Sequence, residues 1–313
     1  MQENRTVIFI AGPTAVGKTK FAIETAKAFD GEIISADSMQ IYKYMDIGSA
    51  KPTKEELAQA KHYLVDEIDP RTEFSAAEYQ TLAKKYIETV FRNGKTPVVS
   101  GGTGLYLNSL LYDMDFSVMP KQAELRRQLE QEAEIRGAES VHDRLKALDP
   151  AAAARIHPNN LKKVIRAIEV LETTGKGIPE FQESFVPTGD YRCILIGLTR
   201  ERKELYRRID DRVDQLMEAG LVKEVEALLE KGLTENSIAM KGIGYKEIIA
   251  YLHGAYDLEE AVRLVKRNTR HYAKRQLTWL RRYPEMIWFN LSEFPTEEDA
   301  LTAIFTTIRS YLT

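Results

Sequence analysis

Residues 12–19 read Gly12-Pro13-Thr14-Ala15-Val16-Gly17-Lys18-Thr19, which matches the phosphate-binding pattern G-x-x-x-x-G-K-[ST]. An apolar run at 7–11 precedes the pattern, and a stretch with helical periodicity at 21–29 follows it. In a strand–turn–helix context, backbone N–H groups and the helix N-terminus attract phosphate. Lys18 adds a full positive charge, and Thr19 is placed to hold a magnesium ion. We therefore expect a di- or triphosphate to bind here.

Strands and helices alternate on both sides of a charged middle segment. Strands are expected at 31–36, 96–100, 193–198 and 286–289, with helices that include 76–91, 105–110, 202–217 and 258–282. This alternation predicts parallel βαβ units, whose strands end at a common ligand-binding edge. Between 119 and 187 the sequence is helical, with candidate helices at 123–136, 139–148 and 160–173. We predict an α/β fold with a P-loop core at 1–118 and 190–313 and an inserted helical domain at 119–189.

Composition supports an enzyme of the cytoplasm. The chain has 313 residues, of which 43% are hydrophobic and 29% charged, as is typical of a soluble globular protein. Its single cysteine, Cys193, lies in an apolar run, which predicts a buried strand residue and excludes a disulfide framework. The sequence shows no signal peptide or membrane-spanning run, so we expect no membrane association.

A carboxylate follows the second predicted strand. Asp37 comes directly after residues 31–36, at the sheet edge where the phosphate loop is expected. Such a carboxylate can take a proton from a bound nucleophile, and a turn-forming or helix-capping aspartate fits the position equally well. Ser38 and Gln40 follow it with neutral groups suited to a base edge or a sugar.

The third predicted strand ends in Ser100 and continues into the turn Gly101-Gly102-Thr103-Gly104. Paired glycines allow close backbone approach, and the Thr103 hydroxyl can cap the next helix, contact a substrate, or both. Ser100 stands where P-loop NTPases carry a metal-binding carboxylate, so a general ATPase is disfavoured. The pattern leaves room for a transferase that holds a diphosphate.

Two arginines share a face of the helix predicted at 202–217. Arg208 and Arg212 are four residues apart, beside an apolar face that includes Leu205 and Ile209. Guanidinium groups suit a departing diphosphate because they contact its oxygens in two places. Salt bridges to Asp211 or Glu204 are the structural alternative.

A basic helix is predicted near the C-terminus. Residues 262–282 contain eight Lys or Arg and no Asp or Glu, in a chain whose net charge is −3. Arg263, Arg267, Arg270, Lys274 and Arg281 fall on one face, which is the pattern expected for nucleic-acid phosphates or for a solvated basic surface. The inserted segment adds further cations. These are Arg126, Arg127, Lys162, Lys163 and Arg166.

Taken in order, these stretches resemble one family over nearly the whole chain, the bacterial tRNA dimethylallyltransferases, or tRNA isopentenyltransferases. The phosphate-loop motif alone occurs in many protein families, but the ordered set of segments is specific to this one. The matching segments are residues 12–19, 37–42 (Asp-Ser-Met-Gln-Ile-Tyr), 45–53 (Met-Asp-Ile-Gly-Ser-Ala-Lys-Pro-Thr), 101–106 (Gly-Gly-Thr-Gly-Leu-Tyr), 166–170, 241–247 (Lys-Gly-Ile-Gly-Tyr-Lys-Glu) and 274–281 (Lys-Arg-Gln-Leu-Thr-Trp-Leu-Arg).

The resemblance implies transfer of a dimethylallyl group from dimethylallyl diphosphate to the exocyclic amine of the adenosine just 3′ of the anticodon. The family's tRNAs read codons that begin with U. It also implies a nucleoside-kinase-like core, Mg²⁺ as cofactor and an insertion that helps hold the anticodon stem-loop. A monomer is the expected state.

The resemblance also implies roles for individual residues. Asp37 matches the general base, Lys18 and Thr19 match diphosphate and magnesium contacts, and Arg208 or Arg212 matches the arginine that steadies the diphosphate, with Arg208 favoured. The phosphate loop holds the donor as a leaving-group site. The positions that match tRNA contacts or lie on the basic helix are Asp37, Ser38, Met39, Gln40, Thr103, Arg126, Lys162, Lys163, Arg166, Arg270 and Lys274.

Two other functions share part of this pattern. An adenylate isopentenyltransferase would use the same chemistry on free AMP or ATP, and a small-molecule P-loop kinase would use the same phosphate loop. The basic helix and the insertion favour the tRNA enzyme, because a free nucleotide needs neither surface.

Overall fold

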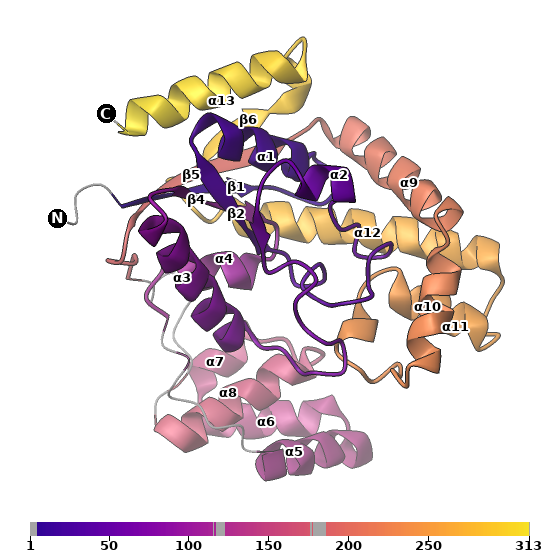
Figure 1. The fold of residues 1–313 in the computed structure, drawn as a ribbon. Helices are drawn as coiled ribbons and strands as arrows, with labels where there is room; N and C mark the ends of the chain where they lie inside the picture. The colour runs from indigo at the N-terminus through magenta and orange to yellow at the C-terminus, as the bar shows by residue number, and fades with distance from the viewer. Residues whose placement is uncertain (1–4, 115, 117–122, 176, 178–185, 313) are drawn as a thin grey trace. The chain divides into compact units, whose positions relative to one another are not determined.

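The computed structural model describes residues 5–114, 116, 123–175, 177 and 186–312 (Figure 1). The chain divides into two compact units, one formed by Met1–Leu111 with Thr188–Thr313 and the other by Tyr112–Pro187. The second unit has bounds near those predicted for the insertion, although the predicted boundary at 118 and 119 lies outside the described residues. No helix in the described part is both long and apolar enough to span a bilayer.

A six-stranded sheet with order β3-β2-β4-β1-β5-β6 forms the centre of the first unit. Every neighbouring pair is parallel, as the alternation of strands and helices predicts. The strands are β1 (Thr6–Ala11), β2 (Gly31–Ala36), β3 (His62–Tyr63), β4 (Thr96–Gly101), β5 (Arg192–Thr199) and β6 (Ile287–Asn290). The carboxyl ends of β1, β2 and β4 therefore lie together, because Ala11 and Ala36 both pair with Gly101.

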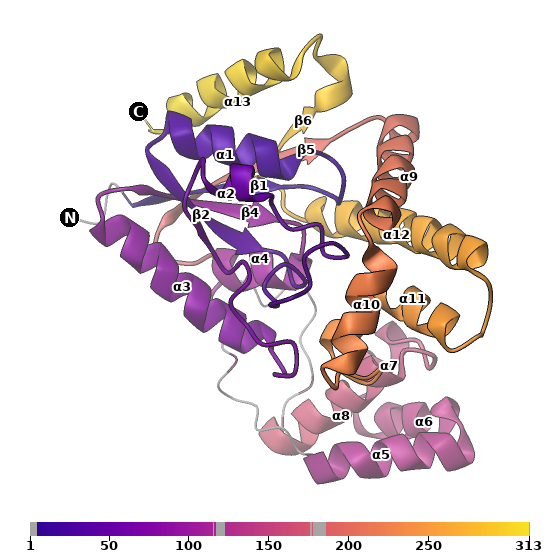
Figure 2. The ribbon, with the colours of Figure 1, turned by 45° about the vertical axis from the view of Figure 1, so that its right-hand side comes forward.

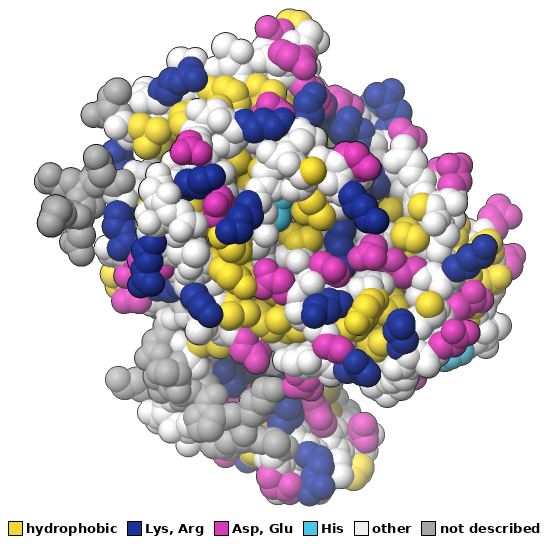
Figure 3. Space-filling view, viewed as in Figure 1, with side chains coloured by type: hydrophobic (Ala, Val, Ile, Leu, Met, Phe, Trp, Pro, Cys, Tyr) yellow, Lys and Arg dark blue, Asp and Glu magenta, His cyan; other side chains and the backbone are white. Residues whose placement is uncertain are grey.

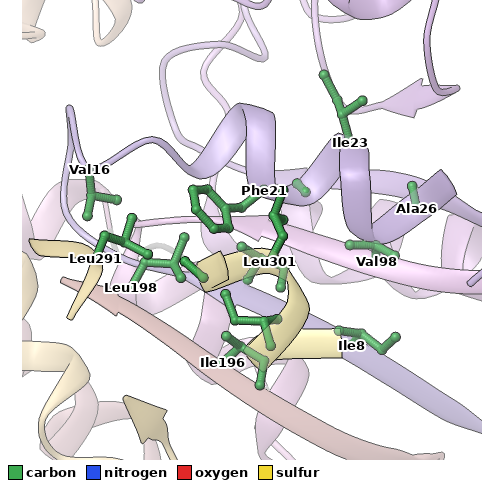
Figure 4. Close-up of a cluster of buried hydrophobic side chains, with 14 of the residues drawn as sticks. Ile8, Val16, Phe21, Ile23, Ala26, Val98, Ile196, Leu198, Leu291 and Leu301 are labelled. Carbon is green, nitrogen blue, oxygen red and sulfur yellow. The ribbon is translucent and has the colours of Figure 1, made fainter. Parts of the chain in front are cut away.

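Helices cover both faces of this sheet. The helices α1 (Lys18–Ala28) and α13 (Glu297–Leu312) lie side by side over one face, and α3 (Ala76–Arg92) and α4 (Gly104–Leu111) lie on the other (Figures 1 and 2). Figure 4 shows the core beneath α1, where Phe21 lies over Leu198 and Ala26 lies over Val98. Burial of these apolar side chains fixes α1, and with it the loop that precedes α1.

A further group of helices lies between β5 and β6 in the chain. The helices α9 (Arg202–Glu218) and α12 (Leu258–Leu280) pack against each other, and α10 (Leu221–Glu230) and α11 (Tyr245–Leu252) pack beside them. The apolar face predicted for α9 is confirmed, since Leu205, Ile209 and Val213 are buried. The short α2 (Lys54–Leu57) follows the loop after β2.

The second unit is helical, as predicted for the insertion. It contains α5 (Ala123–Arg136), α6 (Ala138–Leu148), α7 (Pro150–Arg155) and α8 (Leu161–Thr174) around an apolar core of its own. Its chain ends meet, because Asp113 N donates a hydrogen bond to Val186 O at 2.8 Å. An insertion whose ends meet and whose core is separate can be added to a sheet domain without disturbing it.

Candidate active site

The phosphate loop connects β1 to α1, as the pattern predicts. Its backbone is left-handed at Ala15 (φ 62°) and at Gly17 (φ 115°), which curls the chain around a hollow. A glycine adopts this conformation without strain, whereas Ala15 is a strained residue of the kind that gathers at functional sites. The Lys18 ammonium reaches back across the loop and donates to Pro13 O at 2.8 Å.

Two neighbouring cavities open around this loop. One, here called the polar chamber, has a volume of about 500 Å³ and is lined by Thr19, Ser100, Arg208 and Gln215 among others. The other, here called the apolar chamber, has a volume of about 450 Å³ and is lined largely by apolar and aromatic side chains such as Tyr42, Phe74 and Leu216. The residues that line both chambers are Thr14, Ala15, Lys18, Asp37, Ser49 and Arg212.

Asp37 lies at this shared boundary, at the end of β2. Its Oδ1 atom accepts hydrogen bonds from Met39 N at 2.9 Å and Gln40 N at 3.3 Å, so the turn-forming role is real. Within the described part of the chain, Oδ2 accepts no hydrogen bond. One carboxylate therefore holds the turn with one oxygen and presents the other as a proton acceptor.

The Thr103 hydroxyl is tied to the same turn. It accepts a hydrogen bond from Ser38 N at 3.1 Å and lies 3.4 Å from Ser38 Oγ. The capping role considered from the sequence is thus replaced by a bond between the start of α4 and the turn after β2. Thr103 thereby fixes the position of Asp37 relative to the glycine-rich turn.

Arg208 and Arg212 both point from α9 to the loops of the site. Arg208 Nε donates to Ala15 O at 2.9 Å, and an Arg212 terminal nitrogen lies 3.4 Å from Ala50 O. Glu204, the salt-bridge partner considered from the sequence, pairs with Arg200 instead. Burial lowers the pKa of both Arg208 and Arg212, an environment that favours binding of an anion. Both arginines line the polar chamber, and only Arg212 of the two also lines the apolar chamber.

Burial also changes Lys18. Desolvation lowers its pKa to about 8, against the opposing attraction of Asp37, and the positive charge of Arg212 lowers it further. Two cations and one carboxylate thus meet where the chambers join. The excess of positive charge suits a diphosphate, whose oxygens can be shared by Lys18, Arg212 and the loop N–H groups.

Thr19, Asp37 and Ser100 supply oxygen atoms to the polar chamber. Among the described residues, no group of three or more His, Cys, Asp or Glu side chains is placed to hold a metal ion. Mg²⁺ binds through one or two protein oxygens together with substrate phosphates and water, so this sparse donor set fits it.

Sequence reasoning missed two residues that support the loop. Gln276 on α12 connects Thr14 N (2.9 Å) with Gly102 O (3.0 Å), and Arg200 Nε donates to Val16 O at 3.0 Å. Arg200 follows β5, the strand beside β1. This position at the ligand-binding edge could have identified Arg200 as a site residue from the sequence. The sequence indication for Gln276 was weaker. Gln276 lies one helical turn after Tyr272, and both residues line the apolar chamber.

The basic face of α12 is less positive than the sequence suggests. Arg263 pairs with Glu260, Lys266 with Asp214, and Arg270 with Asp210. Lys274 is exposed and remains a candidate for phosphate contact. On the face of the first unit in Figure 3, positive and negative side chains are interspersed rather than gathered by sign.

The cations of the second unit differ in their surroundings. Lys162 and Lys163 are exposed at the start of α8. Arg126 makes two hydrogen bonds of 2.8 Å to Glu169, which is 3% exposed, and Arg166 lies 3.3 Å from the same carboxylate. Arg126 and Arg166 therefore neutralise a buried charge, whereas the two lysines extend into solvent.

His62 stays outside this arrangement. It lies in β3, and its Nδ1 is 2.8 Å from Ala60 O. Burial lowers its pKa, which favours the neutral ring. It lines neither of the two chambers.

Comparisons with known proteins match this chain over most of its length. The family model described as "IPP transferase" matches residues 40–283. The tRNA dimethylallyltransferase of Alkaliphilus oremlandii is 55% identical over 300 residues, covering 96% of each chain, and that of Clostridioides difficile is 48% identical, covering 97% of each.

Solved structures of the same kind are similar over the whole fold. The tRNA isopentenylpyrophosphate transferase of Bacillus halodurans has a TM-score of 0.75 and 41% identity, covering 99% of this chain and 97% of its own. A eukaryotic dimethylallyltransferase acting on tRNA has a TM-score of 0.81 and 29% identity, covering 98% of this chain and 80% of its own. With these matches across nearly its full length, the chain belongs to the IPP transferase family of tRNA dimethylallyltransferases.

Proposed function

We propose that this chain moves the dimethylallyl group of dimethylallyl diphosphate to the exocyclic amine of the adenosine immediately 3′ of the anticodon. The acceptors are tRNAs that read codons starting with U, and the second product is diphosphate. The observation that carries the proposal is the position of Asp37 at the boundary between a chamber suited to diphosphate and one suited to a prenyl chain and a base.

In this mechanism the diphosphate lies against the phosphate loop, Lys18 and Arg208 in the polar chamber. Thr19 would hold Mg²⁺ when it binds with the diphosphate, and the ion would supply further neutralisation of the leaving group. The adenosine leaves its stack, at a cost of a few kcal/mol, and enters from the apolar chamber. The allylic C–O bond breaks as the amine nitrogen bonds to the freed carbon, and Asp37 takes the proton that the amine loses.

The partners follow from the same reasoning. The anticodon stem-loop is the proposed tRNA element, and Lys162, Lys163 and Lys274 are the exposed cations proposed to contact its phosphates. We propose a monomer as the working form. We place the reaction in the cytoplasm.

One experiment separates this function from its rivals. Labelled dimethylallyl diphosphate is given to the protein with unmodified tRNA, AMP or ATP in parallel, with Asp37→Asn as the matched inactive control. We expect label in tRNA alone, confined to the anticodon-loop fragment after nuclease digestion. Label in AMP or ATP and none in tRNA would establish the adenylate enzyme instead.

A further inference from the structure

The loop at 45–53 is held from outside by one carboxylate. Glu224, in the first turn of α10, accepts three consecutive backbone N–H groups: Asp46 N (2.8 Å) and Ile47 N (2.7 Å) on Oε2, and Gly48 N (2.9 Å) on Oε1. Three adjacent N–H groups that converge on one anion form a nest, a geometry that binds carboxylate or phosphate. Here the protein supplies the anion from its own helix.

Tyr245 completes the same contact. Its hydroxyl donates to Glu224 Oε1 at 2.8 Å, and its ring lies against Gly48. A Cβ at Gly48 would be 2.5 Å from the Tyr245 ring, so only glycine permits this approach. Burial raises the pKa of Tyr245, which keeps its hydroxyl protonated as a donor. Glu224 and Tyr245 thus close on the loop from α10 and α11.

The other end of this loop reaches the active site. Ala50, left-handed at φ 49°, directs its carbonyl toward Gln40 Nε2 (3.1 Å) and an Arg212 nitrogen (3.4 Å). Lys51, whose side chain is 7% exposed, pairs with Asp46 inside the loop (2.6 Å) and with Asp66 outside it (2.7 Å). The place of the Ala50 carbonyl therefore depends on a short segment whose start is fixed by Glu224.

We propose that Glu224 is a positioning residue for the transfer reaction: it fixes the 46–48 backbone so that Ala50 O holds Arg212 at the boundary of the two chambers. The inference rests on the proposed function, and it adds Arg212, which lines both chambers, to the groups that contact the diphosphate there. Glu224 lines neither chamber, so its effect reaches the substrate through the loop.

Glu224→Ala is compared with Glu226→Ala, which removes an exposed carboxylate from the same helix. We expect Glu224→Ala to lower kcat/KM for dimethylallyl diphosphate by roughly 10- to 100-fold, the scale of a small misplacement of a reacting group. Its affinity for tRNA and the activity of Glu226→Ala should stay at wild-type values. Added formate or acetate should restore part of the lost kcat/KM by occupying the emptied nest.

Two further variants make the test decisive. Glu224→Gln keeps the side chain's shape with one acceptor oxygen, and it serves in the same assays if the alanine variant does not fold. Glu224→Ala combined with Arg212→Lys should be little worse than Arg212→Lys alone, because both changes act on one group. Wild-type KM and kcat in the folded Glu224 variant, or loss that is fully additive with Arg212→Lys and unaffected by formate, would overturn the inference. Label transfer by the wild-type protein tests the proposed function separately.

Discussion

The side-chain oxygen of Gln276 accepts a hydrogen bond from the backbone N–H of Thr14 at 2.9 Å. Its amide nitrogen donates to Gly102 O, so one side chain of α12 connects the turns after β1 and β4. Gln276 is 6% exposed, and its bond to Gly102 O is buried. The two turns that face the substrate are thereby attached to a helix that also packs against α9, which carries Arg208 and Arg212.

Replacing Gln276 with alanine should destabilise the fold. The change removes the donor to the buried Gly102 carbonyl, and leaving that carbonyl unsatisfied costs about 1–3 kcal/mol. Chemical denaturation measures the free energy of unfolding. Thr278→Ala, an exposed change on the same helix, is the control and should stay within about 0.5 kcal/mol of wild type. Equal stability of the two variants would refute the connecting role.

Asp37→Asn should abolish most turnover while leaving tRNA affinity intact. The amide oxygen can still accept from Met39 N and Gln40 N, so the turn keeps its shape, but the group no longer accepts a proton. General-base loss predicts a fall of about 100- to 10,000-fold in the single-turnover rate. Asp37→Ala is the companion variant. Full single-turnover activity in either one would remove Asp37 from the reaction.

Diphosphate binding to the free protein should weaken as pH rises through about 8. Lys18 is charged below that pKa and neutral above it, because burial has lowered the value from 10.5 to about 8. Titration calorimetry with pyrophosphate measures the affinity on both sides of this pH. Lys18→Arg stays charged, so its affinity should not fall over that range; a wild-type affinity that is also constant would contradict the prediction.

The same Lys18 shift acts on stability with the opposite sign. The unfolded chain binds the Lys18 proton more tightly than the folded protein does. Between about pH 8 and 10.5, Lys18 is therefore largely deprotonated in the folded protein and still protonated in the unfolded chain. The contribution of Lys18 to the free energy of unfolding therefore increases as pH rises across that window. Comparison of wild type with Lys18→Met by denaturation at several pH values isolates this contribution.

Arg208→Gln should weaken retention of the diphosphate product. Arg208 lines the polar chamber and is fixed by Ala15 O, whereas Arg207 on the same helix is exposed. Removing one charged donor predicts a loss of about 1.5–3 kcal/mol in affinity for pyrophosphate. Arg207→Gln is the matched control. Indistinguishable product-inhibition constants for the two variants would assign the diphosphate contact to Arg212 instead.

Changes in the second unit should separate RNA binding from folding. Replacing Lys162 and Lys163 together with alanine should weaken tRNA binding and reduce the slope of log affinity against log salt by about 0.7–0.9 for each phosphate that is no longer neutralised. Arg126→Ala should instead lower the melting temperature, because it removes a partner of buried Glu169. An unchanged salt slope in the double-lysine variant would exclude that surface from tRNA contact.

The local sequence pattern was sufficient to predict much of the fold. The predicted strands at 7–11 and 96–100 and the helices at 76–91 and 202–217 are confirmed within a few residues, since each carries its own periodicity or turn signal. Two short elements were missed: β3 has two residues, and α7 has six with a run of alanines. The Asp149 cap and Pro150 at the first position of α7 were the available signal.

The chemistry of the site divides in the same way. Residues 12–19 and Asp37 could be selected from the sequence, because motif spacing and a strand end place them at one sheet edge. Arg208 was selected together with Arg212 from helical spacing and favoured through the family resemblance. The contacts that hold them could not. Gln276 and Thr14 are 262 residues apart, and Glu224 is more than 170 residues from the loop that it holds. Such contacts leave no periodic trace, because they depend on where α10 and α12 pack after the chain has folded.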